Sequence, residues 1–156
     1  MAEKYHIVTY GCQMNVHESE KIAGILHRLG YEETDKNENA DIIVFNTCCI
    51  RENAENHAFG NIGALKKLKK QKPNLLIAVG GCMTQEKGKT DVLKKKFPFI
   101  DIMFGTLNLE ELETLIKRKK KGLSCFFDTS VPYFREKGKR RTKNDCISAG
   151  GCDMIR

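Results

Sequence analysis

The chain has 156 residues, of which 40% are hydrophobic and 30% are charged, enough for one domain with an apolar core and a charged surface. No apolar run approaches the roughly 20 residues of a membrane span, and the opening MAEKYHIV lacks the apolar centre of a signal peptide, so we expect a cytoplasmic protein without a membrane partner. The formal charge is +7, but residues 1–115 carry −1 and residues 116–156 carry +8, so a basic surface is predicted only in the C-terminal part.

The first half of the chain alternates predicted strands with a predicted helix. KYHIVTY (4–10) is typical of a strand, and Asn15 with Glu18 three residues later has the form of a capping box at the start of a helix. Gly30 is a natural residue after a helix end. The inner face of that helix is formed by apolar residues at helical spacing, namely Ile22, Ile25, Leu26 and Leu29. YEET (31–34) predicts a weak second strand.

The rest of the alternation contains two strands whose centres are apolar throughout, as expected of strands covered on both faces. These are ADIIVFN (40–46) and NLLIAVG (74–80). The remaining predicted elements are a helix over 51–71 with Ala58, Ile62 and Leu65 inside, a helix over about 84–96, a strand over 101–105, a last helix capped by Asn108 with Leu109, Leu112, Leu115 and Ile116 inside, and a further short strand over 123–129.

This alternation predicts an α/β fold with a mostly parallel sheet of five or six strands and helices on both faces, of flavodoxin-like or Rossmann-like type. We place one domain at 1–129. Beyond it the periodicity fades, so 130–156 is expected to be a basic linker and tail.

Three cysteines stand in equivalent places after predicted strands: Cys12, Cys48 and Cys82 each follow a strand by about two residues. The carboxyl ends of parallel strands meet at one edge of the sheet, where such folds bind ligands. In the strand order 2-1-3-4-5 the three strands would be direct neighbours, about 4.8 Å apart. The sequence therefore predicts that the three thiols converge.

Three convergent thiolates are a metal-ligand set. No CxxC pair of the kind common in zinc sites occurs, whereas thiolates from three loops suit a 4Fe–4S cluster and leave one iron open. Gly11, Gly80 and Gly81 would let the backbone approach a bulky ligand. The alternative is that each cysteine is a small buried hydrophobe, which we expect for Cys49 and Cys125. The four histidines share no metal-ligand spacing and are expected to be structural or surface residues.

Seven is an odd number, so the cysteines cannot all form disulfides within one chain. Because the sequence has no signal peptide, we expect a reducing compartment.

Three separate motifs each surround one of the three cysteines: TYGCQMNVHESE (9–20), NTCCIRENAENHAFGNIGALKKLKK (46–70) and PNLLIAVGGCMTQ (73–85). In this order the three motifs resemble the N-terminal domain of the methylthiotransferases over roughly 4–128, and the YGCQMN form is similar to the branch that modifies N6-dimethylallyladenosine in tRNA.

The resemblance implies that Cys12, Cys48 and Cys82 hold an auxiliary 4Fe–4S cluster, with the sulfur to be transferred on its open iron. It further implies a second 4Fe–4S cluster and S-adenosylmethionine in a radical-SAM domain, an RNA-binding domain, and addition of a methylthio group to C2 of the adenosine at tRNA position 37. The implied partners are tRNA, sulfur donors and iron–sulfur assembly proteins.

The chain contains no CxxxCxxC motif, and Cys146 and Cys152 have five residues between them. We therefore expect the radical-SAM and RNA-binding domains to be absent and this chain alone not to be catalytic. A second hypothesis is a non-catalytic α/β module that binds RNA or a partner through KRKKK (117–121) and REKGKRRTK (135–143), with incidental thiols. The alternative to phosphate binding is that these basic runs are simply a solvated helix end and a charged tail. A thiol redox protein is disfavoured because CxxC is missing.

Overall fold

Five strands form one parallel sheet in the order β2-β1-β3-β4-β5 in the computed structural model, which describes residues 2–48, 52–85 and 88–122. The predicted α/β class and the parallel sheet are confirmed, and the order is the one on which convergence of the three thiols depends. The predicted strand at 123–129, the domain boundary at 129 and the tail 130–156 lie outside the described residues.

The elements follow the predicted alternation, with shorter edge strands than the sequence indicates. In chain order they are β1 (Lys4–Thr9), α1 (Gln13–Arg28), β2 (Glu32–Glu33), η1 (Asn37–Asn39), β3 (Ile42–Thr47), α2 (Glu52–Gln71), β4 (Leu76–Gly81), η2 (Cys82–Gln85), α3 (Lys89–Lys96), β5 (Ile102–Met103), η3 (Thr106–Glu111) and α4 (Leu112–Lys120).

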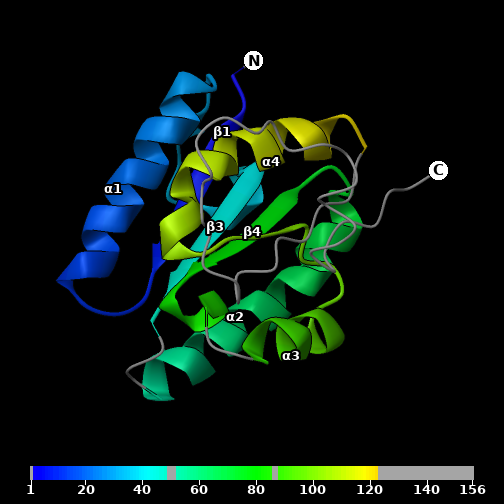
Figure 1. Ribbon diagram of the computed structural model, residues 1–156. Helices are drawn as coiled ribbons and strands as arrows, with labels where there is room; N and C mark the ends of the chain where they lie inside the picture. Colours follow the sequence, from blue (N-terminus) through cyan, green and yellow to red (C-terminus); the bar gives the residue numbers. More distant parts are fainter. Residues whose placement is uncertain (1, 49–51, 86–87, 123–156) are drawn as a thin grey trace, which may run out of the picture.

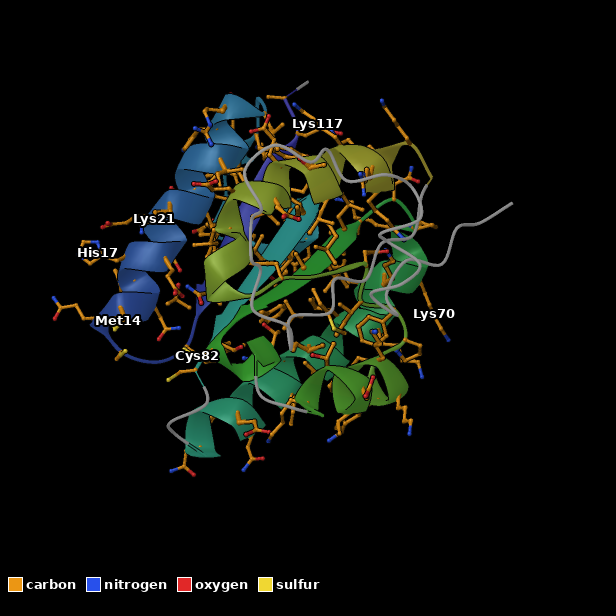
Figure 2. All side chains as sticks on the ribbon, in the orientation of Figure 1. Met14, His17, Lys21, Lys70, Cys82 and Lys117 are labelled. Carbon is orange, nitrogen blue, oxygen red and sulfur yellow. The ribbon has the colours of Figure 1, made fainter. Side chains whose placement is uncertain are left out.

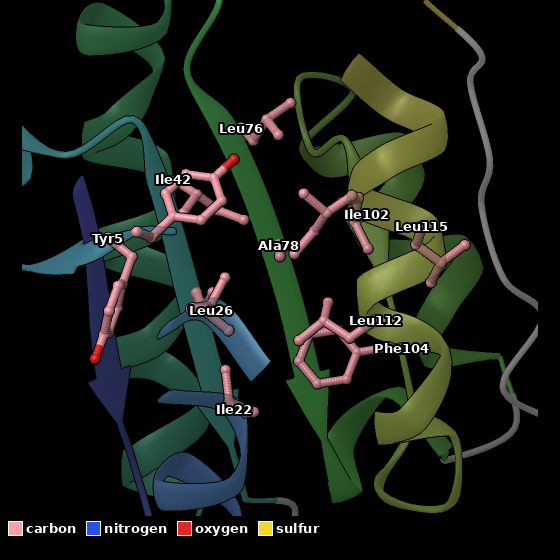
Figure 3. Packing of buried hydrophobic residues seen from close by; sticks show 13 residues of the cluster. Tyr5, Ile22, Leu26, Ile42, Leu76, Ala78, Ile102, Phe104, Leu112 and Leu115 are labelled. Carbon is pink, nitrogen blue, oxygen red and sulfur yellow. The ribbon is translucent and has the colours of Figure 1, made fainter. Parts of the chain in front are cut away.

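Helices cover both faces of the sheet, with α1 and α4 on one side and α2 and α3 on the other (Figure 1). Alternate side chains of the central strands serve the two faces, because successive residues of a strand point to opposite sides. Ile42 and Val44 pack with α1 and α4 (Figure 3), whereas Ile43 and Phe45 pack with α2. Every residue of β3 and β4 is buried, which accounts for their unbroken apolar runs.

Three predicted helix starts are wrong. The N-cap of α1 is Cys12, and Asn15 is a buried residue in the first turn instead of the cap. The segment predicted as one helix over 84–96 consists of η2 and α3, and α3 begins after Gly88. The last helix begins at Leu112 with Glu111 as its N-cap, because Asn108 lies within η3.

Within residues 2–48, 52–85 and 88–122, no helix has both the length and the hydrophobicity that crossing a bilayer requires.

Candidate metal centre

The three predicted cysteines lie at the carboxyl edge of three adjacent strands. The β1–β3 ladder ends with Thr9 opposite Asn46, and the β3–β4 ladder ends with Thr47 opposite Gly81. Cys48 and Cys82 directly follow this last pair of residues, so the two cysteines leave neighbouring strands at the same level of the sheet.

Cys12 reaches the same edge through a short turn after β1. It comes three residues after the end of β1 and is the N-cap of α1. Figure 2 shows Met14, two residues beyond Cys12, at the same end of the molecule as Cys82. The fold thus places the three cysteine-bearing loops at the same edge of the sheet, whereas the predicted convergence of the three sulfur atoms stays a prediction.

The three side chains differ in exposure. Cys48 is buried, Cys82 is half-buried and Cys12 is exposed, and all three are thiols and not disulfides. Among the described residues, no group of three or more His, Cys, Asp or Glu side chains is close enough to hold a metal ion. The loops are therefore assembled, whereas the sulfur atoms are not gathered into a closed ligand set. Cys49, Cys125, Cys146 and Cys152 lie outside the described residues.

The glycines of the motifs make room for protein atoms, which differs from the predicted role of admitting a ligand. A Cβ at Gly11 would lie 2.5 Å from the Cβ of Cys48, and a Cβ at Gly81 would lie 2.1 Å from the carbonyl oxygen of Thr47. Both glycines also have positive φ, which disfavours other residues. A Cβ at Gly80 would lie 2.2 Å from the ring of Phe104. The cysteine loops pack closely because these positions have no side chain.

Two buried asparagines connect the Cys12 loop to the end of β3. The Asn15 Nδ2 group donates to Asn46 Oδ1 at 3.2 Å and to the Thr47 carbonyl at 3.3 Å. Asn46 Nδ2 donates in return to the Asn15 carbonyl at 2.7 Å and to Ser19 Oγ at 3.0 Å. The backbone N–H of Cys12 donates to Asn15 Oδ1 at 3.3 Å, and Cys12 Sγ lies 3.5 Å from that oxygen.

A pair of threonines ties the end of β4 to its neighbours. The Thr47 hydroxyl donates to the Gly80 carbonyl at 2.7 Å, linking β3 to β4. The Thr84 hydroxyl lies 2.9 Å from the Gly81 carbonyl and 2.6 Å from the Phe104 carbonyl, linking η2 to the chain after β5.

Sequence reasoning missed the role of these polar residues. The sequence pattern predicts Asn15 as an ordinary N-cap and Asn46 as the end of a strand, and it assigns no role to Thr47. The sequence does contain a signal for this role: two polar residues end a strand that is otherwise apolar and covered on both faces. Buried polar groups require hydrogen-bond partners, so such residues indicate buried contacts.

The Glu18 carboxyl interacts with one of the two asparagines, Asn46. Burial raises the pKa of the Glu18 carboxyl, and a hydrogen bond from Asn46 and the charge of Lys21 oppose that shift. The histidines have other roles, as predicted: His6 Nδ1 contacts the Thr34 carbonyl at 2.7 Å, and His27 Nε2 contacts the Tyr5 hydroxyl at 3.0 Å.

The donor chemistry of this edge fits an iron–sulfur cluster better than a hard cation. Thiolates are soft ligands that select iron–sulfur clusters, zinc or copper, whereas magnesium and calcium prefer oxygen. Two of the three thiols reach solvent, so a bulky inorganic group can approach them. The residues present therefore suit a cluster bound through three sulfur atoms.

Comparison with known proteins finds one matching family model and several bacterial relatives that this chain resembles. Residues 4–105 match the model of the uncharacterized protein family UPF0004. The chain is 52% identical over 134 residues to a tRNA-2-methylthio-N(6)-dimethylallyladenosine synthase of Clostridium botulinum strain Hall, covering 86% of this chain and 29% of that protein. A protein of the same name from Caldicellulosiruptor saccharolyticus is 56% identical over 112 residues, covering 72% of this chain and 24% of the relative. The chain thus spans less than a third of the length of these relatives.

Proposed function

The chain belongs to the UPF0004 family, whose domain forms the N-terminal part of methylthiotransferases, and on that basis we propose that it is the domain that binds an auxiliary 4Fe–4S cluster in a tRNA methylthiotransferase. Cys12, Cys48 and Cys82 are the proposed ligands. The observation that carries the proposal is the position of all three cysteines after adjacent strands at one edge of the sheet.

The proposed substrate is tRNA carrying N6-dimethylallyladenosine, as the name of the relatives implies, with a methylthio group added at C2 of the base at position 37. S-adenosylmethionine and a second 4Fe–4S cluster are assigned to parts of the enzyme other than this domain, since the domain spans 29% of such a relative. Sulfur donors and iron–sulfur assembly proteins are the further proposed partners, and the proposed location is the cytoplasm.

A cluster held by three thiolates supplies an iron without a protein ligand, open to a sulfur species. Cys12, Cys48 and Cys82 would hold this group through their sulfur atoms. Each thiol must lose its proton to become a ligand, so loading releases protons and is favoured at higher pH. Cys48 is 2% exposed and anchors the site inside the protein, whereas exposed Cys12 forms its solvent side.

Anaerobic reconstitution with iron and sulfide tests the proposal. The full chain is expected to bind about four irons and to turn brown. Single changes Cys12→Ala, Cys48→Ala and Cys82→Ala should each abolish or severely reduce the bound iron. Met14→Ala is a matched control, because Met14 is 73% exposed and two residues from Cys12 but offers no thiol. Stable colour in the triple cysteine variant would refute the assignment.

The second hypothesis, an RNA-binding module with incidental thiols, has weaker support from the surface of α4. Within KRKKK (117–121), Lys119 pairs with Asp101 at 3.2 Å and Lys120 pairs with Glu3. Lysines engaged in ion pairs within the fold are less available to phosphates. Salt dependence of tRNA binding by the full chain decides the matter: steep salt dependence unaffected by the cysteine changes would favour this second hypothesis.

A further inference from the structure

The exposed ligand Cys12 depends on hydrogen bonds for its position. Buried Cys48 is held by packing, but Cys12 is exposed on a turn and has little packing to hold it. Its backbone N–H and its Sγ both contact Oδ1 of Asn15, at 3.3 Å and 3.5 Å. Asn15 is 1% exposed, so this anchor is itself inside the protein.

The orientation of the Asn15 amide follows from its partners. Asn46 Nδ2 faces the Asn15 carbonyl, which can only accept, so Asn46 must present Oδ1 to the Asn15 side chain. Asn15 Nδ2 therefore faces two acceptors, Asn46 Oδ1 and the Thr47 carbonyl. The remaining Oδ1 is directed at Cys12, and a flipped amide would set oxygen against oxygen at both contacts.

We propose that Asn15 and Asn46 are positioning residues for the cluster, and that they fix the Cys12 turn to the end of β3, next to Cys48. The inference rests on the proposed function, because it assumes that Cys12 and Cys48 bind the same group. The two amides join the N-cap of α1 to the last residues of β3, so the Cys12 turn and the strand before Cys48 move as one unit. Outer-shell partners of this kind typically change metal affinity by about 10- to 100-fold when removed.

Two substitutions at Asn15 break the connection in different ways. Asn15→Asp keeps the shape and an acceptor for Cys12 but replaces the donor that faces Asn46 and Thr47 with an acceptor. Asn15→Ala removes the side-chain contact to Cys12 and the contacts to Asn46 and Thr47, without adding charge. Ser19→Ala is the matched control, because it removes one bond to Asn46 and one to Thr9 but leaves the contacts to Cys12 intact.

The experiment measures iron release from the reconstituted full chain to a chelator, together with the electron paramagnetic resonance spectrum of the reduced cluster. Both Asn15 variants are expected to release iron about 10- to 100-fold faster than the unsubstituted chain and to show an altered spectrum. Ser19→Ala should match the unsubstituted chain in both readouts. If Asn15→Ala does not fold, Asn46→Ala provides the same test from the strand side, with release again accelerated.

Two results separate the possible failures. An unsubstituted chain that binds no iron would overturn the proposed function and this inference with it. A loaded unsubstituted chain, with Asn15 variants that keep its release rate and spectrum, would overturn the positioning role alone. Equal acceleration by Ser19→Ala would also overturn it, because general loosening of the loop would then explain the effect.

Discussion

Gly80→Ala should destabilise the protein through a clash with a single aromatic ring. A Cβ at position 80 would lie 2.2 Å from Cε2 and Cζ of Phe104 and 2.7 Å from Cδ2. Carbon atoms in good contact are about 3.5–4.0 Å apart, so the ring or the strand must move by more than roughly 1 Å. Phe104 is 1% exposed and packs in the cluster with Ala78 and Leu112 (Figure 3), so the ring cannot move aside freely.

The magnitude follows from two opposing effects. Overpacking a well-filled core typically costs about 1–3 kcal/mol. Gly80 is not among the glycines with positive φ, so alanine adds no backbone strain and lowers the entropy of the unfolded chain, which offsets roughly 0.4–1 kcal/mol. The middle of the two ranges gives an expected loss of about 1 kcal/mol in the free energy of unfolding, or a decrease of about 2–4 °C in melting temperature.

Urea unfolding followed by circular dichroism measures this loss. Gly60→Ala is the matched control, since Gly60 is an exposed residue of α2 with no atom within 4 Å of its added Cβ, and it should be neutral or stabilising. Phe104→Leu combined with Gly80→Ala should cost less than the sum of the single changes, because the shorter side chain relieves the clash. An unchanged midpoint for Gly80→Ala, or strict additivity in the double variant, would refute the reasoning.

Two further predictions concern charged groups. Asp101→Ala should lower the free energy of unfolding, measured by urea denaturation, by about 3 kcal/mol. The change removes the carboxylate that pairs with Lys69 at 2.6 Å and with Lys119 at 3.2 Å, and it leaves both ammonium groups without this partner beside a buried site. Asp101→Asn should cost less, and a loss below about 1 kcal/mol for the alanine variant would contradict the expectation. The folded-state pKa of Glu18 is raised above the ordinary 4.5, so the folded chain binds the proton more tightly and stability falls as pH rises through that folded-state pKa. Glu18→Gln should remove this loss and be at least as stable as the unsubstituted chain at pH 7. The expectation would be contradicted by a glutamine variant that is less stable at pH 7 but equally stable at pH 4, because ionised Glu18 would then stabilise the fold.

The strands and the cysteine positions could be predicted because their signals are local. The apolar runs within 40–46 and 74–80 indicate strands covered on both faces, and Cys48 and Cys82 lie just beyond them. Cys12 lies just beyond the predicted strand at 4–10. Helix starts were predicted less well. Asn15 has the preferences of an N-cap, which are worth about 1 kcal/mol, but its amide instead lies buried against Asn46 and Thr47, and Cys12 takes the cap position.

The sequence by itself determined the alternation of elements, the two-faced core and the placement of three thiols after strands, because each depends on spacing between near neighbours in the chain. Only the tertiary structure decided that Gly80 is needed for Phe104, that Gly11 is needed for Cys48, and that Asn15 and Asn46 join the first cysteine loop to β3. The two asparagines are 31 positions apart, and the parallel ladder brings them together. A local pattern carries no information on which distant side chain will fill the space next to it, so these contacts follow from the packed fold alone.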